Sequence, residues 1–105
     1  MLTTSYATLT EGATTETLTE ALTVAYAGRP FVRVLAPGAM ADSKRVRGTN
    51  VIELQAVADP RSGTGVVVGA VDNLVKGAAG QAIQNLNLAL GLDEAEGLPA
   101  VAVYP

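Results

Sequence analysis

Hydrophobic and polar residues alternate in short stretches of the chain and recur at helical spacing in two longer ones. Residues 2–9 are rich in Thr, Tyr and Leu with partial alternation, which predicts a strand. The next stretch can be capped by Thr14 or Thr15 and ends at Gly28, a residue type that commonly terminates helices. Its apolar side chains share one helical face: Leu18, Ala21, Leu22, Ala25 and Tyr26.

Three further stretches predict strands, at residues 31–35, 51–59 and 65–72. The last two are separated by a spacer that contains proline, serine and two glycines, which predicts a hairpin. The 65–72 stretch is apolar on both faces, a pattern typical of a central, covered strand. In the 51–59 stretch, one face carries Ile52, Leu54 and Ala56, and the other carries Glu53 and Gln55.

A second helical pattern covers residues 77–90 and ends at Gly91, and residues 100–104 predict a last strand. The order is therefore strand, helix, strand, hairpin, helix, strand. This order predicts an α+β fold, a small and mostly antiparallel sheet with two helices. The apolar stripe of the second helix, which we expect to be buried, consists of Ala79, Ala82, Ile83, Leu86 and Leu90.

Composition narrows the classes of function. The net charge is −3, whereas nucleic-acid-binding domains carry a basic surface, so we expect no nucleic-acid partner. The chain has no cysteine and no histidine, which excludes thiol catalysis and zinc–thiolate sites and removes the commonest general base. The acids near residue 94 lack the spacing of a calcium loop, so we expect no metal. No apolar run approaches the roughly 20 residues of a membrane span and no signal peptide is evident, which predicts a cytoplasmic protein.

The segment "KGAAGQ", residues 76–81, resembles a phosphate-binding loop at the start of a helix. Its lysine precedes the glycines, which is the reverse of the nucleotide-binding order. The pattern therefore favours a structural role, in which Gly77 and Gly80 let a helix begin close to another backbone.

Three basic residues and one polar junction are the other candidates. Lys44 and Arg45 fit a solvated loop better than an anion site, whereas Arg47 fits either equally well. Asp72 and Asn73 follow a predicted strand, where such residues either form a turn or contribute to a site, and the turn is favoured.

Several segments together resemble N-acetyl-gamma-glutamyl-phosphate reductases, an enzyme family of arginine biosynthesis. They are "PFVRVL", "VRGTN", "VDNLVKGAAGQAIQNLNLALGLDEAEGL" and the ending "AVYP". The resemblance extends over essentially all 105 residues, but only to the C-terminal portion of the family. Two departures are Thr49, where the family usually has serine, and residues 51–59, which lack an expected aromatic residue.

The resemblance implies a larger enzyme around this chain. Family members have a Rossmann-type NADP-binding domain, followed by a catalytic domain related to that of glyceraldehyde-3-phosphate dehydrogenase. The catalytic cysteine and histidine and the cofactor's glycine fingerprint precede the matched region, so we expect no catalytic residue here. Residues 1–105 would then be the C-terminal part of the catalytic and dimerisation domain, with residues 77–105 packing toward the missing cofactor domain. The family also implies a homo-oligomer.

The resemblance assigns cofactor-binding roles for NADP to Asn73, Gly77, Gly80 and Gln81. Arg47 is the candidate for binding an anionic substrate. Two alternatives remain open at the level of the sequence. One is the related acyl-phosphate reductase of lysine biosynthesis, and the other is a non-catalytic oligomerisation or interaction module that kept the fold.

Overall fold

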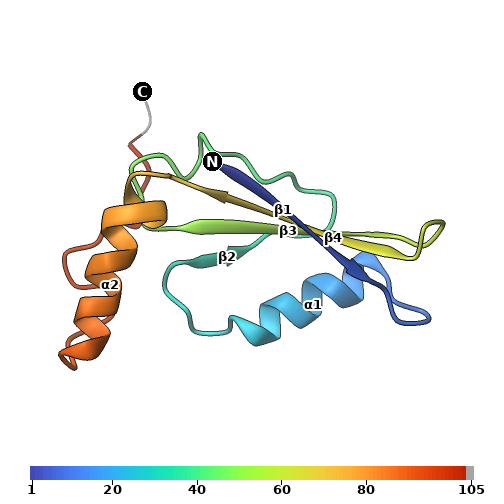
Figure 1. Cartoon of the computed structure of the whole chain (residues 1–105), viewed down its shortest axis with the longest axis horizontal. Coiled ribbons are helices and arrows are strands. Elements are labelled where there is room, and N and C mark those ends of the chain that lie inside the picture. Colours follow the sequence, from blue (N-terminus) through green and yellow to red (C-terminus); the bar gives the residue numbers. More distant parts are fainter. Residues whose placement is uncertain (104–105) are drawn as a thin grey trace.

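The computed structural model describes residues 1–103 and shows one four-stranded sheet with two α-helices (Figure 1). A π-helical turn, η1, leads directly into the second α-helix. The elements in chain order are β1 (Leu2–Thr8), α1 (Thr15–Ala25), β2 (Val32–Val34), β3 (Ile52–Asp59), β4 (Thr64–Val71), η1 (Val75–Ala79) and α2 (Gly80–Ala89).

The strand order in the sheet is β1-β4-β3-β2. β4 pairs antiparallel with both β1 and β3, and β2 pairs parallel with β3. The predicted hairpin, the central position of the 65–72 stretch and the α+β class are confirmed. The predicted strand at residues 100–104 is wrong over residues 100–103, which form no strand, while Tyr104 lies outside the described residues. The backbone N–H of Val103 is instead directed to Arg47 O, at 3.3 Å.

Helix α1 begins where its threonines predicted. Thr14 and Thr17 form a reciprocal capping box, in which Thr17 N donates to Thr14 Oγ1 at 3.2 Å and Thr14 N donates to Thr17 Oγ1 at 2.9 Å. The helix lies on one face of the sheet, where Ala58 N of β3 donates to Thr15 Oγ1 at 2.9 Å. Its predicted apolar face is only half covered, because Leu18 and Leu22 are partly buried while Ala21, Ala25 and Tyr26 are exposed.

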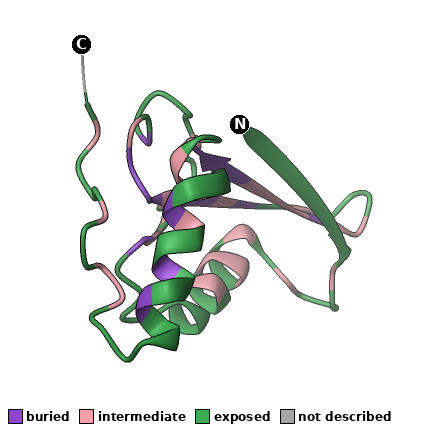
Figure 2. Cartoon of the chain, turned by 60° about the vertical axis from the view of Figure 1, so that its left-hand side comes forward, coloured by how far each residue is buried: buried purple, intermediate pink, exposed green. Residues whose placement is uncertain are grey.

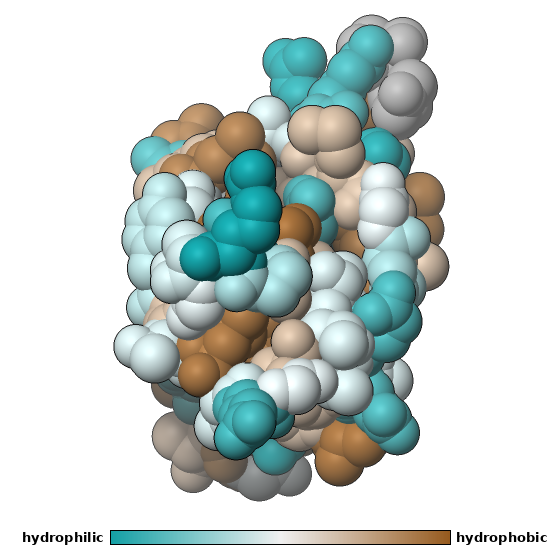
Figure 3. All heavy atoms as spheres, turned by 90° about the vertical axis from the view of Figure 1, so that its right-hand side faces the viewer, coloured by the Kyte–Doolittle hydropathy of each residue, from teal (hydrophilic) through white to brown (hydrophobic). Residues whose placement is uncertain are grey.

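The buried core lies at the end of the sheet next to η1, and β1 stands outside it (Figure 2). Four side chains form the core cluster: Phe31, Val46, Val51 and Ala70. Every residue of β1 is exposed, so this strand is a bare edge of the sheet. The end of the molecule that carries the β3–β4 turn shows separate hydrophobic patches broken by hydrophilic ones (Figure 3).

Helix α2 exists where predicted, but its burial is the reverse of the prediction. Its buried residues are Gly80, Gln84 and Asn87, whereas the whole predicted stripe, Ala79, Ala82, Ile83, Leu86 and Leu90, is exposed. The physical reason is that Gln84 and Asn87 have hydrogen-bond partners beneath the helix, whereas Leu86 and Leu90 remain mostly exposed. Gly91 ends the helix with φ of 70°, as predicted.

Candidate functional site

A pocket of about 420 Å³ lies where the end of β4 meets the loop before β3. The loop contributes Arg47 and Gly48, and the β4–η1 junction contributes Asp72, Leu74 and Val75. Val103 completes the lining. The pocket thus combines apolar walls with one cationic and one anionic side chain, a composition common in small-molecule sites.

Asp72 is the centre of the hydrogen bonds at this junction. One carboxylate oxygen accepts from Gly48 N at 2.8 Å, and the other accepts from Leu74 N at 2.8 Å and Val75 N at 3.1 Å. These hydrogen bonds, that from Gly48 first, lower the pKa of Asp72 below its ordinary value. The sequence favoured a turn at this position, and the carboxylate does form that turn while also binding a distant loop.

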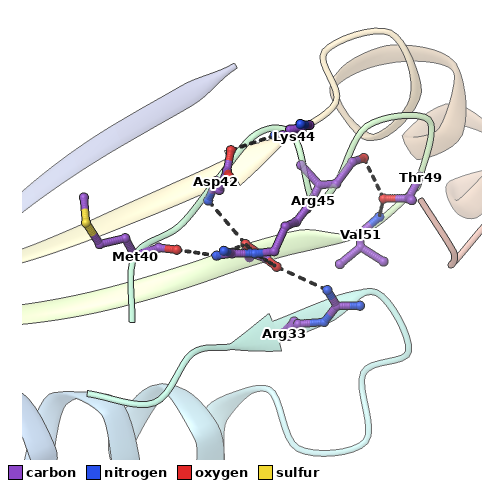
Figure 4. Close-up of polar contacts among 9 residues, drawn as sticks. Arg33, Met40, Asp42, Lys44, Arg45, Thr49 and Val51 are labelled. Carbon is purple, nitrogen blue, oxygen red and sulfur yellow. Dashed lines mark hydrogen bonds and ion pairs between the residues drawn. The ribbon is translucent and has the colours of Figure 1, made fainter. Parts of the chain in front are cut away.

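The loop that carries Arg47 is held by its own polar groups. The buried hydroxyl of Thr49 donates to Val46 O at 2.8 Å and accepts from Val51 N at 3.1 Å (Figure 4). Asn50 N donates to Pro99 O at 2.7 Å. A serine hydroxyl could make the same pair of contacts, so threonine at position 49 is compatible with this loop.

The three basic residues near position 45 do not act together. Arg45 binds the carboxylate of Glu53 through Nε at 3.1 Å and through Nη2 at 3.0 Å (Figure 4). Arg33 reaches the same carboxylate at 3.2 Å. Lys44 donates its backbone N–H to Asp42 in the exposed part of the loop. Of the predicted cluster, Arg47 is the member that lines the pocket.

Glu53 is the buried partner of this basic group, with 1% of its side chain exposed. Burial raises its pKa, but hydrogen bonds from Arg45, from the backbone of Asp42 and from Arg33 outweigh burial, so the net pKa is lowered. Glu53 therefore remains ionised and binds the loop that contains Asp42 and Arg45 to the face of the sheet opposite α1.

The four residues predicted to bind a cofactor are divided between the pocket rim and other places. Asn73 is exposed between two pocket-lining residues, and Gly77 lies against its side-chain oxygen. Gly80 is buried against Asn50 and Val75. Gln81 donates to Asn85 Oδ1 at 2.9 Å along the surface of α2. Thus Arg47 lines the pocket, Asn73 lies between two lining residues in the sequence, and Gly77, Gly80 and Gln81 do not line it.

A buried polar network beneath α2 was not predicted. Gln84 Oε1 accepts from Lys76 Nζ at 2.7 Å and from Asn50 Nδ2 at 2.9 Å, and Gln84 Nε2 donates to Glu94 Oε1 at 2.6 Å. Lys76 also lies 5.6 Å from the centre of the Phe31 ring. Burial lowers the pKa of Lys76, although the charge of Glu94 opposes the shift. Because its ammonium group is used internally, "KGAAGQ" is not arranged as a phosphate loop.

Two amide side chains spaced three residues apart, Gln84 and Asn87, on a side of the helix next to the apolar stripe were the available signal for this network. Asn87, one turn after Gln84, donates to Glu96 O at 2.9 Å. Residues 1–103 contain no group of three acidic, histidine or cysteine side chains arranged to bind a metal. Within the same residues, no helix is both long and apolar enough to cross a membrane.

Comparison of the sequence with known proteins shows the family to which the chain belongs. The family model described as "Semialdehyde dehydrogenase, dimerisation domain" matches residues 1–73, which include all four strands and end beside the pocket. Among curated proteins, one of Pelobacter propionicus is 47% identical over 105 residues, and one of Geobacter sulfurreducens is 46% identical over 105 residues. One of Desulforudis audaxviator is 55% identical over 80 residues, or 76% of this chain.

All three relatives are named N-acetyl-gamma-glutamyl-phosphate reductase, so the resemblance that the sequence motifs indicated is confirmed. The matches cover the C-terminal region of these proteins. The chain spans 30% of the length of the first and third of them and the match to the second spans 23%.

Proposed function

Because the chain belongs to the family of semialdehyde dehydrogenase dimerisation domains, we propose that it is the C-terminal part of an NADP-dependent N-acetyl-gamma-glutamyl-phosphate reductase. The observation that carries this proposal is the similarity of 46–47% over all 105 residues to proteins of that name. The reaction would reduce an acyl phosphate to the semialdehyde in cytoplasmic arginine biosynthesis. NADPH would supply the hydride.

The chain's own residues fit a binding role rather than a catalytic one. Leu74 and Val75 give the pocket apolar walls that exclude water, and Arg47 places a permanent positive charge beside them. A guanidinium group recognises carboxylate and phosphate oxygens through paired hydrogen bonds, which suits an acidic acyl-phosphate substrate. The chain has no thiol or imidazole, so these groups would come from the rest of the enzyme.

Asn73 is the best-placed residue for contact with the cofactor. It is exposed between Asp72 and Leu74, which line the pocket, and its amide can donate or accept a hydrogen bond. Gly77 and Gln81 follow on the exposed side of the same segment and would border the cofactor from there. Gly80 would act from beneath, since it allows η1 and α2 to lie close to Asn50.

The exposed apolar side of α2 supports the proposed domain arrangement. Leu86 is 56% exposed and Leu90 is 65% exposed on a helix whose polar side is already occupied. A helix that buries Gln84 and Asn87 and exposes its leucines is complementary to an apolar surface elsewhere. We assign that surface to the cofactor domain, which would contact residues 77–105.

A second surface supports homo-oligomer formation through the sheet. Tyr6, Val66 and Val57 are direct cross-strand neighbours on β1, β4 and β3, and they therefore share one face. Tyr6 is 73% exposed on that face. The dimerisation-domain model covers the strands and ends before η1, which agrees with self-association through the sheet and domain contact through α2.

The test is a chimera in which this chain replaces the matching 30% of the Geobacter sulfurreducens reductase. We expect the chimera to reduce NADP in the presence of the semialdehyde and inorganic phosphate, and the 105-residue chain alone to show no activity above the buffer blank. The longer acyl chain of the lysine-pathway substrate should be used less efficiently. A folded, dimeric chimera without turnover would overturn the proposal and favour a non-catalytic interaction module.

A further inference from the structure

The carboxylate of Asp72 connects two of the segments that line the pocket. Through Gly48 N it holds the loop that carries Arg47, and through Leu74 N and Val75 N it holds the start of η1. Gly48 and Asp72 are 24 positions apart in the sequence, so this is a tertiary link. A local turn would need only the other two hydrogen bonds.

The backbone conformation of Gly48 makes the position of the Arg47 loop depend on the hydrogen bond with Asp72. Its φ of 73° is in the region that favours glycine, and an added Cβ would lie 3.3 Å from the Val103 side chain. On its other side, Arg47 has a backbone hydrogen bond of 3.3 Å with Val103 N. The 2.8 Å hydrogen bond to the Asp72 carboxylate is the shorter of the two, and its acceptor is ionised.

We propose that Asp72 is a positioning residue for Arg47, because its carboxylate fixes the distance between the Arg47 loop and the η1 wall of the pocket. The role rests on the proposed function, in which Arg47 binds the anionic substrate. We assign Asp72 no direct bond to the substrate, because its carboxylate is anionic like the substrate and both of its oxygens already accept backbone N–H groups. Its contribution would appear as substrate affinity and not as a chemical step.

Asp72→Asn in the chimera tests the hydrogen bond from Gly48 separately from those of Leu74 and Val75. The amide keeps its one oxygen toward Leu74 and Val75, and it then presents an NH₂ group, which cannot accept, to the Gly48 N–H. We expect hydrogen exchange over residues 46–50 to accelerate by roughly tenfold while residues 73–77 change little, as the loss of one charge-assisted hydrogen bond predicts. The KM for inorganic phosphate with the semialdehyde should rise by roughly tenfold, with kcat within about twofold.

Asp59→Asn is the matched control. Asp59 also accepts a backbone N–H in a turn, from Arg61 at 3.1 Å, but it lies at the far end of the β3–β4 hairpin. It should leave both exchange over residues 46–50 and the KM unchanged.

The double variant with Arg47→Ala decides whether Asp72 acts through Arg47. If it does, Asp72→Asn causes no further rise in KM once Arg47 is removed. Equal rises in both backgrounds, or unchanged exchange over residues 46–50, would overturn the proposal. A wild-type KM for Arg47→Ala would instead refute the substrate role of Arg47 in the proposed function, and the exchange measurement would still report on the Asp72 link.

Discussion

Gly80 lies against the side chain of Asn50 so closely that residue 80 has no space for a Cβ atom. Such an atom would overlap Asn50 Oδ1 and would lie 2.8 Å from the carbonyl oxygen of Val75. Asn50 is itself completely buried and is bound to Gln84 of α2. The contact therefore joins the loop before β3 to the start of α2, and it requires glycine for an internal reason.

Gly80→Ala should destabilise the chain by about 1–3 kcal/mol, because backbone atoms of η1 cannot move away from the new methyl group. The measurement is the free energy of unfolding from urea denaturation. Gly77→Ala is the control, since the nearest atom to its added Cβ is the side-chain oxygen of Asn73 at 3.0 Å, which can rotate away. Equal effects of the two substitutions would contradict the packing role of Gly80.

Glu53 should make the stability of the chain depend on pH in the acid range. Its pKa is lower in the folded state than the ordinary value of 4.5, so its ion pairs stabilise the fold above that value. The stabilisation should begin to fall as the pH drops below about 4.5 and should be lost once the pH passes the lowered folded-state pKa. Thermal unfolding measured between pH 7 and the acid limit of solubility tests this expectation.

Glu53→Gln should lower stability at pH 7 by about 1–3 kcal/mol, because a buried neutral amide replaces the acceptor of two arginines. The variant should also lose this component of the acid dependence. Glu20→Gln is a suitable control, since Glu20 is exposed on α1. If wild type and Glu53→Gln lost stability in parallel on acidification, Glu53 would not be the responsible group.

Local features of the fold were predictable because they depend on neighbouring residues. The capping threonines of α1, the alternation in β3 and the turn between β3 and β4 each have a short-range cause. Periodicity also located α2, but it could not show which side of the helix faces inward. That direction depends on the hydrogen bond of Gln84 with Asn50, 34 positions away, and on those of Gln84 and Asn87 with Glu94 and Glu96 in the turn after the helix.

The candidate site also combines residues that the sequence could identify with contacts that only the tertiary structure determines. Arg47, which its charge made a candidate, lines the pocket, whereas Asn73, a candidate through the family resemblance, is not among the lining residues. The use of Asp72 to link two loops, and the inward direction of Lys76, require tertiary contacts that no local pattern contains. Glu53 was placed on the correct face of its strand, but its ion pairs with Arg33 and Arg45 were not predicted.

Tyr6→Asp should weaken self-association of the chain by at least about tenfold, because it places a charge in the apolar cross-strand row with Val66 and Val57. Sedimentation velocity over a concentration series measures the effect. Ser5→Asp is the matched control, since successive residues of a strand point to opposite faces and Ser5 lies on the side of α1. Similar weakening by both substitutions would indicate association through the edge of β1 instead of the sheet face.

Substitutions on α2 should have effects opposite to those expected from its amphipathic pattern. In the isolated chain, Leu86→Gln should change stability by no more than about 0.5 kcal/mol, because Leu86 is largely exposed. Asn87→Leu should cost about 1–3 kcal/mol, since it removes the donor to Glu96 O and leaves that carbonyl without its partner. Urea denaturation of the two variants distinguishes these expectations.

In the chimera, Leu86→Gln should become destabilising because the cofactor domain would cover this position. If Leu86→Gln remained neutral in a stable and active chimera, the apolar side of α2 would not be the contact surface between the domains.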